Sequence, residues 1–412
     1  MLPVNLKNRV VAFSPSLEIL LTRGTGFLLF LWISLLFPLS SIGKWGLVLT
    51  ILNLVEVFAL QITTPFLQRE VSLKTEQKFW LPEFKLAGLH LSFFLTPFVI
   101  LLLLAGISTR FDYLTERDSV FILTGFVIQF LPVFLSSVCF ASRRFFSFLM
   151  LKTSVPVLLL IFSLTANSQQ DLLSQWSEWY LIAHLINLLL SIFVFFFNYK
   201  NIRFFRIRIQ QVFAYNFPVS LSTLISVLIN RLDILVFSIF LPASALGIYY
   251  SARRFVQINE AGLQVISRLS YHPMVKGFGI GQIAGILVVA KLWIKNSLII
   301  QILLFTLILF PLFFIYPKEK DMLVLTYLFL SVSIFIRCFS QQYGMALDLA
   351  GFPKDNMKYL IFGLIIHLLL YMFWVSIAGY WGIVTTVPIA YLAGFWMVKK
   401  RITVLSQVNT GI

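Results

Sequence analysis

The chain has 412 residues, of which 59% are hydrophobic and only 12% charged, and its mean hydropathy is +0.92. This composition is typical of an integral membrane protein and leaves no polar stretch long enough for a soluble domain. Its apolar runs are continuous rather than alternating, which excludes a transmembrane β-barrel. The two cysteines, Cys139 and Cys338, fall in apolar stretches, and the sequence predicts no metal or redox centre.

The apolar runs predict an all-α polytopic fold. At about 20 residues per span, the chain has room for about 12 transmembrane helices joined by short loops. The expected spans are 17–38, 43–66, 86–106, 119–140, 146–166, 179–198, 213–240, 246–270, 293–316, 322–347, 358–378 and 381–398.

Basic residues are distributed unevenly between the two sides of these spans. If the N-terminus is cytoplasmic, most Lys and Arg residues fall in inner segments, and the positive-inside rule is obeyed. Both termini are therefore predicted to be cytoplasmic, and no cleavable signal peptide is expected. Topology explains the net charge of +16 without a nucleic-acid partner. The outer segments hold only Lys44, Arg110, Arg117, Lys318 and Lys320.

Two outer turns are similar in sequence. Phe37–Trp45 matches Leu241–Tyr249, with a proline, a serine, a glycine and an aromatic residue in register. An even number of predicted spans separates the turns, so the duplication would be parallel. We therefore expect two six-helix lobes, 1–205 and 206–412, related by an axis along the membrane normal. Transporters built from such repeats bind substrate between the halves.

Two neighbouring predicted helices, 213–240 and 246–270, each carry a polar seam. The polar residues recur at three- and four-residue steps, which places them on one helical face. Because an ionised group in hydrocarbon costs at least about 2.5 kcal/mol, each seam must face protein or a water-filled cavity. The first seam contains Asn216, Ser220, Thr223, Ser226, Asn230 and Asp233, and the second Tyr249, Arg253, Gln257, Glu260, Gln264 and Ser267, with Arg254 beside it.

Basic residues outnumber acidic ones among the predicted intramembrane charges, and two interpretations stay open. The charges can be ion pairs that fix helix register, which would be weak support for function. They can instead line a hydrated, central cationic cavity for an anionic substrate, since the arginine fork suits phosphate. The intramembrane charges are Arg23, Glu56, Lys152, Arg231, Asp233, Arg253, Arg254, Glu260 and Arg337. Three histidines in apolar helices, His90, His184 and His367, are interpreted as packing residues.

The sequence contains no motif for catalysis. It has no phosphate-binding glycine loop followed by Lys-Ser/Thr and no nucleophile elbow. A membrane-embedded polymerase or transferase would usually carry a sizeable outer loop with catalytic residues, and none is present here. We therefore predict a transporter rather than an enzyme, with no catalytic residue and no cofactor.

Several short, mostly apolar motifs occur along the chain in a characteristic order. They are Arg23, Gly43–Gly46, Asn216–Pro218, Asn230–Leu235, Leu246–Arg254, Leu349–Lys354 and Ala378–Val384. In this order and spacing the chain resembles the polysaccharide (O-antigen) flippases of the multidrug/oligosaccharidyl-lipid/polysaccharide exporter superfamily. The resemblance covers essentially the whole chain, although the chain is rather short for that family.

The resemblance implies alternating access in the inner membrane of a bacterium. The implied substrate is an undecaprenyl-diphosphate-linked oligosaccharide, moved to the periplasmic leaflet for O-antigen or capsule assembly. A polysaccharide polymerase and a chain-length regulator are further implied partners, besides membrane lipids. Glu56, Asp233 and Glu260 would bind sugar, pair with arginine or carry a coupling H⁺ or Na⁺. The substrate headgroup would be held by Arg23, Asn230, Arg231, Arg253, Arg254, Gln257 and Arg337.

Two alternatives remain. A multidrug or cation antiporter of the same fold would be expected to have an acid-dominated cavity, which the surplus of arginine disfavours. The other alternative is a membrane-embedded polysaccharide polymerase or transferase that acts on the same lipid carrier.

Overall fold

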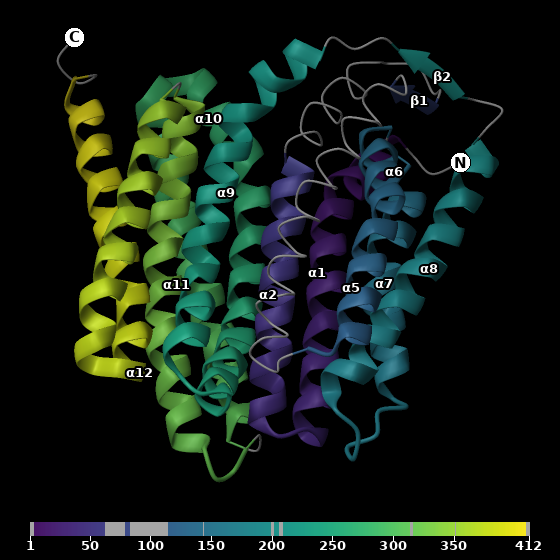
Figure 1. The fold of residues 1–412 in the computed structure, drawn as a ribbon. Helices are drawn as coiled ribbons and strands as arrows, with labels where there is room; N and C mark the ends of the chain where they lie inside the picture. The colour runs from purple at the N-terminus through teal and green to yellow at the C-terminus, as the bar shows by residue number, and fades with distance from the viewer. Residues whose placement is uncertain are drawn as a thin grey trace. The chain divides into compact units, whose positions relative to one another are not determined.

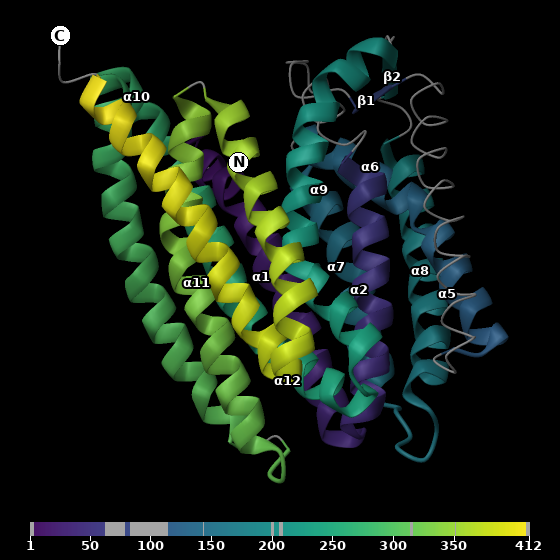
Figure 2. The same ribbon diagram turned by 60° about the vertical axis from the view of Figure 1, so that its left-hand side comes forward.

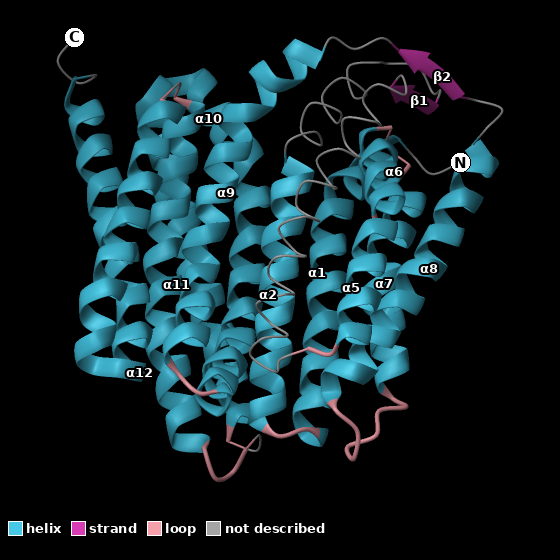
Figure 3. Ribbon diagram, in the orientation of Figure 1, coloured by secondary structure: helices cyan, strands magenta, loops and turns pink. Residues whose placement is uncertain are grey.

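The computed structural model describes residues 4–61, 79–82, 114–142, 144–198, 202–205, 209–313, 316–350 and 352–408. These residues are almost all helical (Figure 3). They form two compact units, Met1–Val227 and Leu228–Ile412, and each unit is considered by itself. The predicted span 86–106 lies outside the described residues.

Unit 1 is a helical bundle with one short strand pair. Its elements are α1 (Val4–Leu36), α2 (Leu39–Gln61), β1 (Phe79–Pro82), α5 (Glu116–Ile128), α6 (Phe130–Ala141), α7 (Phe145–Ser163), α8 (Leu172–Asn198) and β2 (Ile202–Phe205). Helix α8 packs against α5 and α7, and α7 also packs against α1. The two strands pair in parallel, with Phe79 opposite Ile202. An apolar cluster that includes Phe134, Val138 and Leu151 forms part of the core.

Unit 2 begins within α9 (Ile209–Phe240), at Leu228, and continues through three long elements. These are α10 (Ala243–Leu312), α11 (Lys320–Leu349) and α12 (Pro353–Val408), which lie side by side in Figure 1. Helix α11 packs against both α10 and α12.

Both α10 and α12 fold back on themselves. In α12, Gly379 has φ 52° and ψ −123°, a conformation that only glycine adopts easily, and it separates two arms (Figure 2). Arg401 near the end of α12 pairs with Asp355 near its start, at 2.9 Å. In α10, Gln301 donates to the Asn259 carbonyl oxygen at 2.9 Å, which joins its two arms.

The structure supports the predicted all-α, multi-pass class. Among the described residues, eight helical segments are long and apolar enough to cross a membrane. The predicted helices 213–240 and 246–270, which carry the polar seams, are helical in α9 and α10. Between the predicted spans 246–270 and 293–316 the chain stays helical, through the reversal of α10. The total of 12 spans and the lobe boundary near residue 205 stay predictions.

The two turns with similar sequences, at Pro38 and Pro242, have the same local structure. Helices α1 and α9 end just before Pro38 and Pro242, as expected because the residue before proline disfavours helical geometry. The proline carbonyl oxygen then accepts a hydrogen bond from Ile42 N or Leu246 N, at 3.1 Å in both turns. The aromatic residues that follow, Trp45 and Tyr249, are both buried. The sequence match between the turns therefore extends to their backbone geometry.

Close backbone packing at the reversal of α10 makes Gly285 intolerant of a side chain. A Cβ atom at Gly285 would clash with the Gly277 carbonyl oxygen. Gly285→Val is expected to cost at least about 1–3 kcal/mol of stability through overpacking, measured as a lower melting temperature of the purified protein. Gly394→Val is the control, because a Cβ there meets nothing within 4 Å. Equal melting temperatures for the two variants would contradict the close approach.

Candidate functional site

Buried charges of unit 2 form one network. Arg253 of α10 lies between two carboxylates, with its Nε atom 3.7 Å from Asp233 Oδ2 and its Nη2 atom 3.3 Å from Glu260 Oε1. The Arg253 and Asp233 side chains are only 2% and 1% exposed. Glu260 Oε1 also accepts from Arg337 Nη1 of α11, at 2.7 Å. We call Asp233, Arg253, Glu260 and Arg337 the quartet.

Helical spacing explains how the sequence positions the quartet. Arg253 and Glu260 are seven residues apart, which is two turns, so they lie on the same face of α10. Asp233 reaches Arg253 from α9, which is joined to α10 by the short turn at Pro242. The two negative charges of the carboxylates balance the two positive charges of the arginines, so the quartet as a whole carries no net formal charge.

Tyrosine side chains complete the surroundings of the quartet. Tyr249 donates a hydrogen bond to Asp233. The Arg337 guanidinium lies over the ring of Tyr391 of α12, 5.3 Å from its centroid, in a cation–π contact. With Tyr391, the network involves α9, α10, α11 and α12.

Two further arginines lie beside the quartet. Arg254 donates from Nε to the Tyr250 hydroxyl at 2.6 Å and from Nη1 to Gln257 Oε1 at 3.1 Å. Its guanidinium lies 4.9 Å from the centroid of the Tyr250 ring. Arg231 is half-buried and interacts electrostatically with Asp233 and Tyr250. With these two, the cluster contains four arginines and two carboxylates, and its formal charge is positive.

Two aromatic groups of α12 also lie in this region. His367 and Tyr371 are one helical turn apart on α12, are buried, and stack with ring centroids 5.3 Å apart. Both interact electrostatically with Arg253. Neither ring nitrogen of His367 makes a hydrogen bond within the described part of the chain. Their spacing of four residues in an otherwise apolar helix was the signal that they share a face.

The remaining predicted site residues are Asn230, Arg23 and Glu56. The side chain of Asn230 lies outside the described ones, as do those of Asn216, Ser220, Thr223 and Ser226 in the same seam. Arg23 and Glu56 belong to unit 1. Arg23 is exposed on α1. Glu56 interacts electrostatically with Lys152 of α7, a pairing that the sequence did not reveal.

Comparisons with known proteins identify the fold. No protein-family model matches the chain, and no curated protein matches it either. A solved multidrug resistance MATE family transporter of the MOP superfamily, in an inward-facing conformation, aligns with a TM-score of 0.71 and 15% identity, covering 97% of this chain and 99% of that one. The lipid II flippase MurJ, in an inward closed conformation, aligns with a TM-score of 0.70 and 11% identity, covering 96% of this chain and 87% of that one.

A third similar structure is a MOP superfamily transporter from Pyrococcus furiosus, described as having a binding pocket of reverse polarity that suggests a different function. It aligns with a TM-score of 0.63 and 14% identity, covering 96% of both chains. The chain has the fold of MOP superfamily transporters.

The shared Glu260 carboxylate makes the quartet cooperative, which a double-mutant cycle measures. Removing one partner of a buried ion pair costs about 3–5 kcal/mol, because the other charge stays buried. Arg337→Met and Glu260→Gln are each expected to lower the melting temperature, and the double variant should lose less than the sum of the two. Strictly additive losses would show that Arg337 and Glu260 do not interact.

Proposed function

We propose that this protein is a membrane transporter that flips an undecaprenyl-diphosphate-linked oligosaccharide from the cytoplasmic to the periplasmic leaflet. The observation that carries the proposal is the composition of the unit 2 cluster. In the part of the chain that the structure describes, Arg231, Arg253, Arg254 and Arg337 lie with two carboxylates, Asp233 and Glu260. A positive site at membrane depth attracts an anionic headgroup, and arginine matches phosphate oxygens through its planar fork.

Within this proposal the residues have different roles. Arg254 and Arg231 contact the diphosphate, while Asp233 and Glu260 hold Arg253 and Arg337 in place until the headgroup competes for them. Arg23, Asn230 and Gln257 contribute further contacts, and Glu56 is a candidate for sugar contact or ion coupling. In this proposal the arginines of unit 2 provide the cationic part of the substrate site, in a protein of the bacterial inner membrane with both termini cytoplasmic. The protein carries out no chemical reaction.

The likeness to MurJ supports a lipid-linked substrate. That protein is a lipid II flippase, and its structure covers nearly all of this chain. The likeness to multidrug MATE transporters supports drug export equally well. We therefore keep multidrug export as the second candidate. The charge of the cluster separates the two, because a cationic drug would be repelled by the excess of arginine, whereas a diphosphate would be attracted.

Arg254 is the best single residue for a test, because it lies outside the quartet and its loss leaves the buried ion pairs intact. Arg254→Ala should reduce surface polysaccharide at least about tenfold in cells, since hydrogen bonds between charged groups contribute about 1.5–3 kcal/mol. Arg254→Lys should restore part of the polysaccharide, because the charge returns without the fork.

Lys295→Ala is the matched control, since it removes an equal charge from an exposed position on α10. All variants are compared at equal protein abundance in the membrane. Normal polysaccharide with Arg254→Ala would remove Arg254 from the binding site. Increased sensitivity of the deletion strain to cationic drugs, with normal polysaccharide, would favour multidrug export.

A further inference from the structure

Unit 1 contains a polar pocket at the end where α2, α5 and α8 begin. Its volume is about 830 Å³, within the usual range for small-molecule sites. Among the described residues that line it, Leu114 alone has an apolar side chain. The pocket adjoins the first residues of the spans Glu116–Ala141 and Leu172–Phe197, so it lies at a membrane boundary. The predicted topology puts this boundary on the outer side.

The walls of the pocket are fixed by hydrogen bonds. Asp118 is 2% exposed and accepts from the Thr115 hydroxyl at 2.6 Å and the Ser177 hydroxyl at 3.0 Å. Thr115 and Asp118 form the capping box that starts α5. The Gln175 side chain holds the loop before α8 through two hydrogen bonds of 2.8 Å. It accepts from the backbone N–H of Asn167 and donates to the Asn167 carbonyl oxygen. The pocket is therefore pre-formed.

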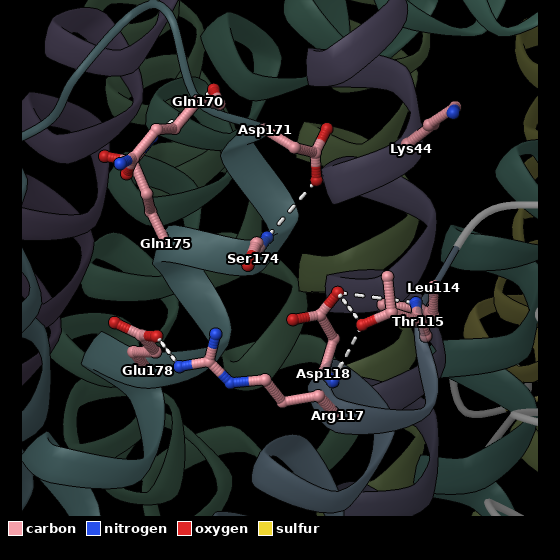
Figure 4. Close-up of a pocket in the computed structure, with 10 residues that line it drawn as sticks. All are labelled: Lys44, Leu114, Thr115, Arg117, Asp118, Gln170, Asp171, Ser174, Gln175 and Glu178. Carbon is pink, nitrogen blue, oxygen red and sulfur yellow. Dashed lines mark hydrogen bonds and ion pairs between the residues drawn. The ribbon is translucent and has the colours of Figure 1, made fainter.

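Other polar groups in the pocket have hydrogen-bonding capacity left. Gln170 and Ser174 accept at their backbone carbonyl oxygens, from Gln175 Nε2 at 3.4 Å and the Ser177 hydroxyl at 2.8 Å, and both residues line the pocket. Asp171 uses one carboxylate oxygen, Oδ2, to accept from the backbone N–H groups of Leu173 and Ser174. Figure 4 shows these side chains around an opening, with the Arg117–Glu178 ion pair at its edge. The available groups include both donors and acceptors.

The charges of the pocket indicate which ligand class fits. Lys44 and Arg117 face three carboxylates, those of Asp118, Asp171 and Glu178, so the formal charge is −1. A phosphate would meet excess negative charge here, unlike in the unit 2 cluster. No group of metal-ligating residues is found among the described side chains. A ligand rich in hydroxyls, each able to donate and accept, matches a mixture of carboxylate, amide and hydroxyl groups.

We propose that this pocket binds the sugar portion of the transported molecule at the outer face of unit 1. The inference deepens the proposed function and relies on it for the identity of the sugar. The carboxylates, amides and hydroxyls of the pocket match the hydroxyl groups of a sugar, whereas its negative formal charge disfavours a diphosphate.

The test uses the full-length protein in lipid nanodiscs and saturation-transfer difference NMR. The probes are free oligosaccharides of hexoses, deoxyhexoses and N-acetylhexosamines, with inorganic pyrophosphate as a separate probe. The variant Gln170→Ala/Ser174→Ala should weaken oligosaccharide binding about tenfold, because two hydrogen bonds are lost. It should leave pyrophosphate binding unchanged.

A neighbouring pair supplies a matched control. Ser168→Ala/Gln169→Ala removes the same side-chain types from exposed positions of the same loop that do not line the pocket. This variant should bind oligosaccharide like the unmodified protein. The proposal is overturned if no probe sugar binds, or if binding survives Gln170→Ala/Ser174→Ala.

The outcomes also separate this inference from the proposed function. Sugar binding at the pocket in a protein whose deletion leaves lipid-linked sugars unchanged would support the pocket and refute the flippase. Cytoplasmic accumulation of lipid-linked sugar, with no sugar binding at the pocket, would support the flippase and refute the pocket.

Discussion

The ion pairs around Glu260 are the interaction on which unit 2 depends. A single carboxylate oxygen lies 3.3 Å from Arg253 and 2.7 Å from Arg337, in a bundle whose surface is made largely of exposed leucine, isoleucine and phenylalanine. In such surroundings an unpaired charge is too costly, so the helices must keep the rotation and depth that bring these groups together. The same ion pairs can also be exchanged for contacts with a bound anion. An anion that competes with Glu260 for its arginines would alter the contacts between α10 and α11, which is what a transport cycle requires of its substrate.

Much of this arrangement could be predicted from residue spacing. The seams on 213–240 and 246–270 placed Asp233, Arg253 and Glu260 on inward faces, and the structure has all three buried or half-buried in one network. The turn at Pro242 was predicted as well. The pairing itself was not predictable, because spacing within a helix says nothing of its rotation or depth relative to a neighbour. From the sequence alone, Arg337 could pair with either Asp233 or Glu260.

Other features escaped prediction for specific physical reasons. His367 was interpreted as a packing residue because a single histidine in an apolar helix carries no pattern, and its nearness to Arg253 depends on how α12 packs. The polar pocket is assembled from three separate segments, so no local motif marks it. Lys44 and Arg117 were interpreted only as topology signals. At the reversal of α10 two glycines approach closely, whereas the sequence analysis predicted only an inner segment between two spans there.

Of the two interpretations of the intramembrane charges, ion pairing is seen in the structure, and binding of an anionic substrate stays a proposal. Asp233, Arg253, Glu260 and Arg337 form the ion pairs expected of a structural network. Arg231 and Arg254 add positive charge beside it, where a diphosphate would be attracted. If the quartet arginines were replaced, a loss of transport would therefore not distinguish impaired folding from impaired substrate binding. Stability and transport need to be measured on separate residues.

The most direct measurement is mass spectrometry of lipid-linked sugars after deletion of this gene alone, with the leaflet assigned by a membrane-impermeant probe. The account predicts that complete, undecaprenyl-diphosphate-linked repeat units accumulate and stay confined to the cytoplasmic leaflet. Complete units accessible from the periplasm would indicate a polymerase or ligase, and truncated units a transferase. Either of these results, or unchanged lipid-linked sugars, would contradict the flippase assignment.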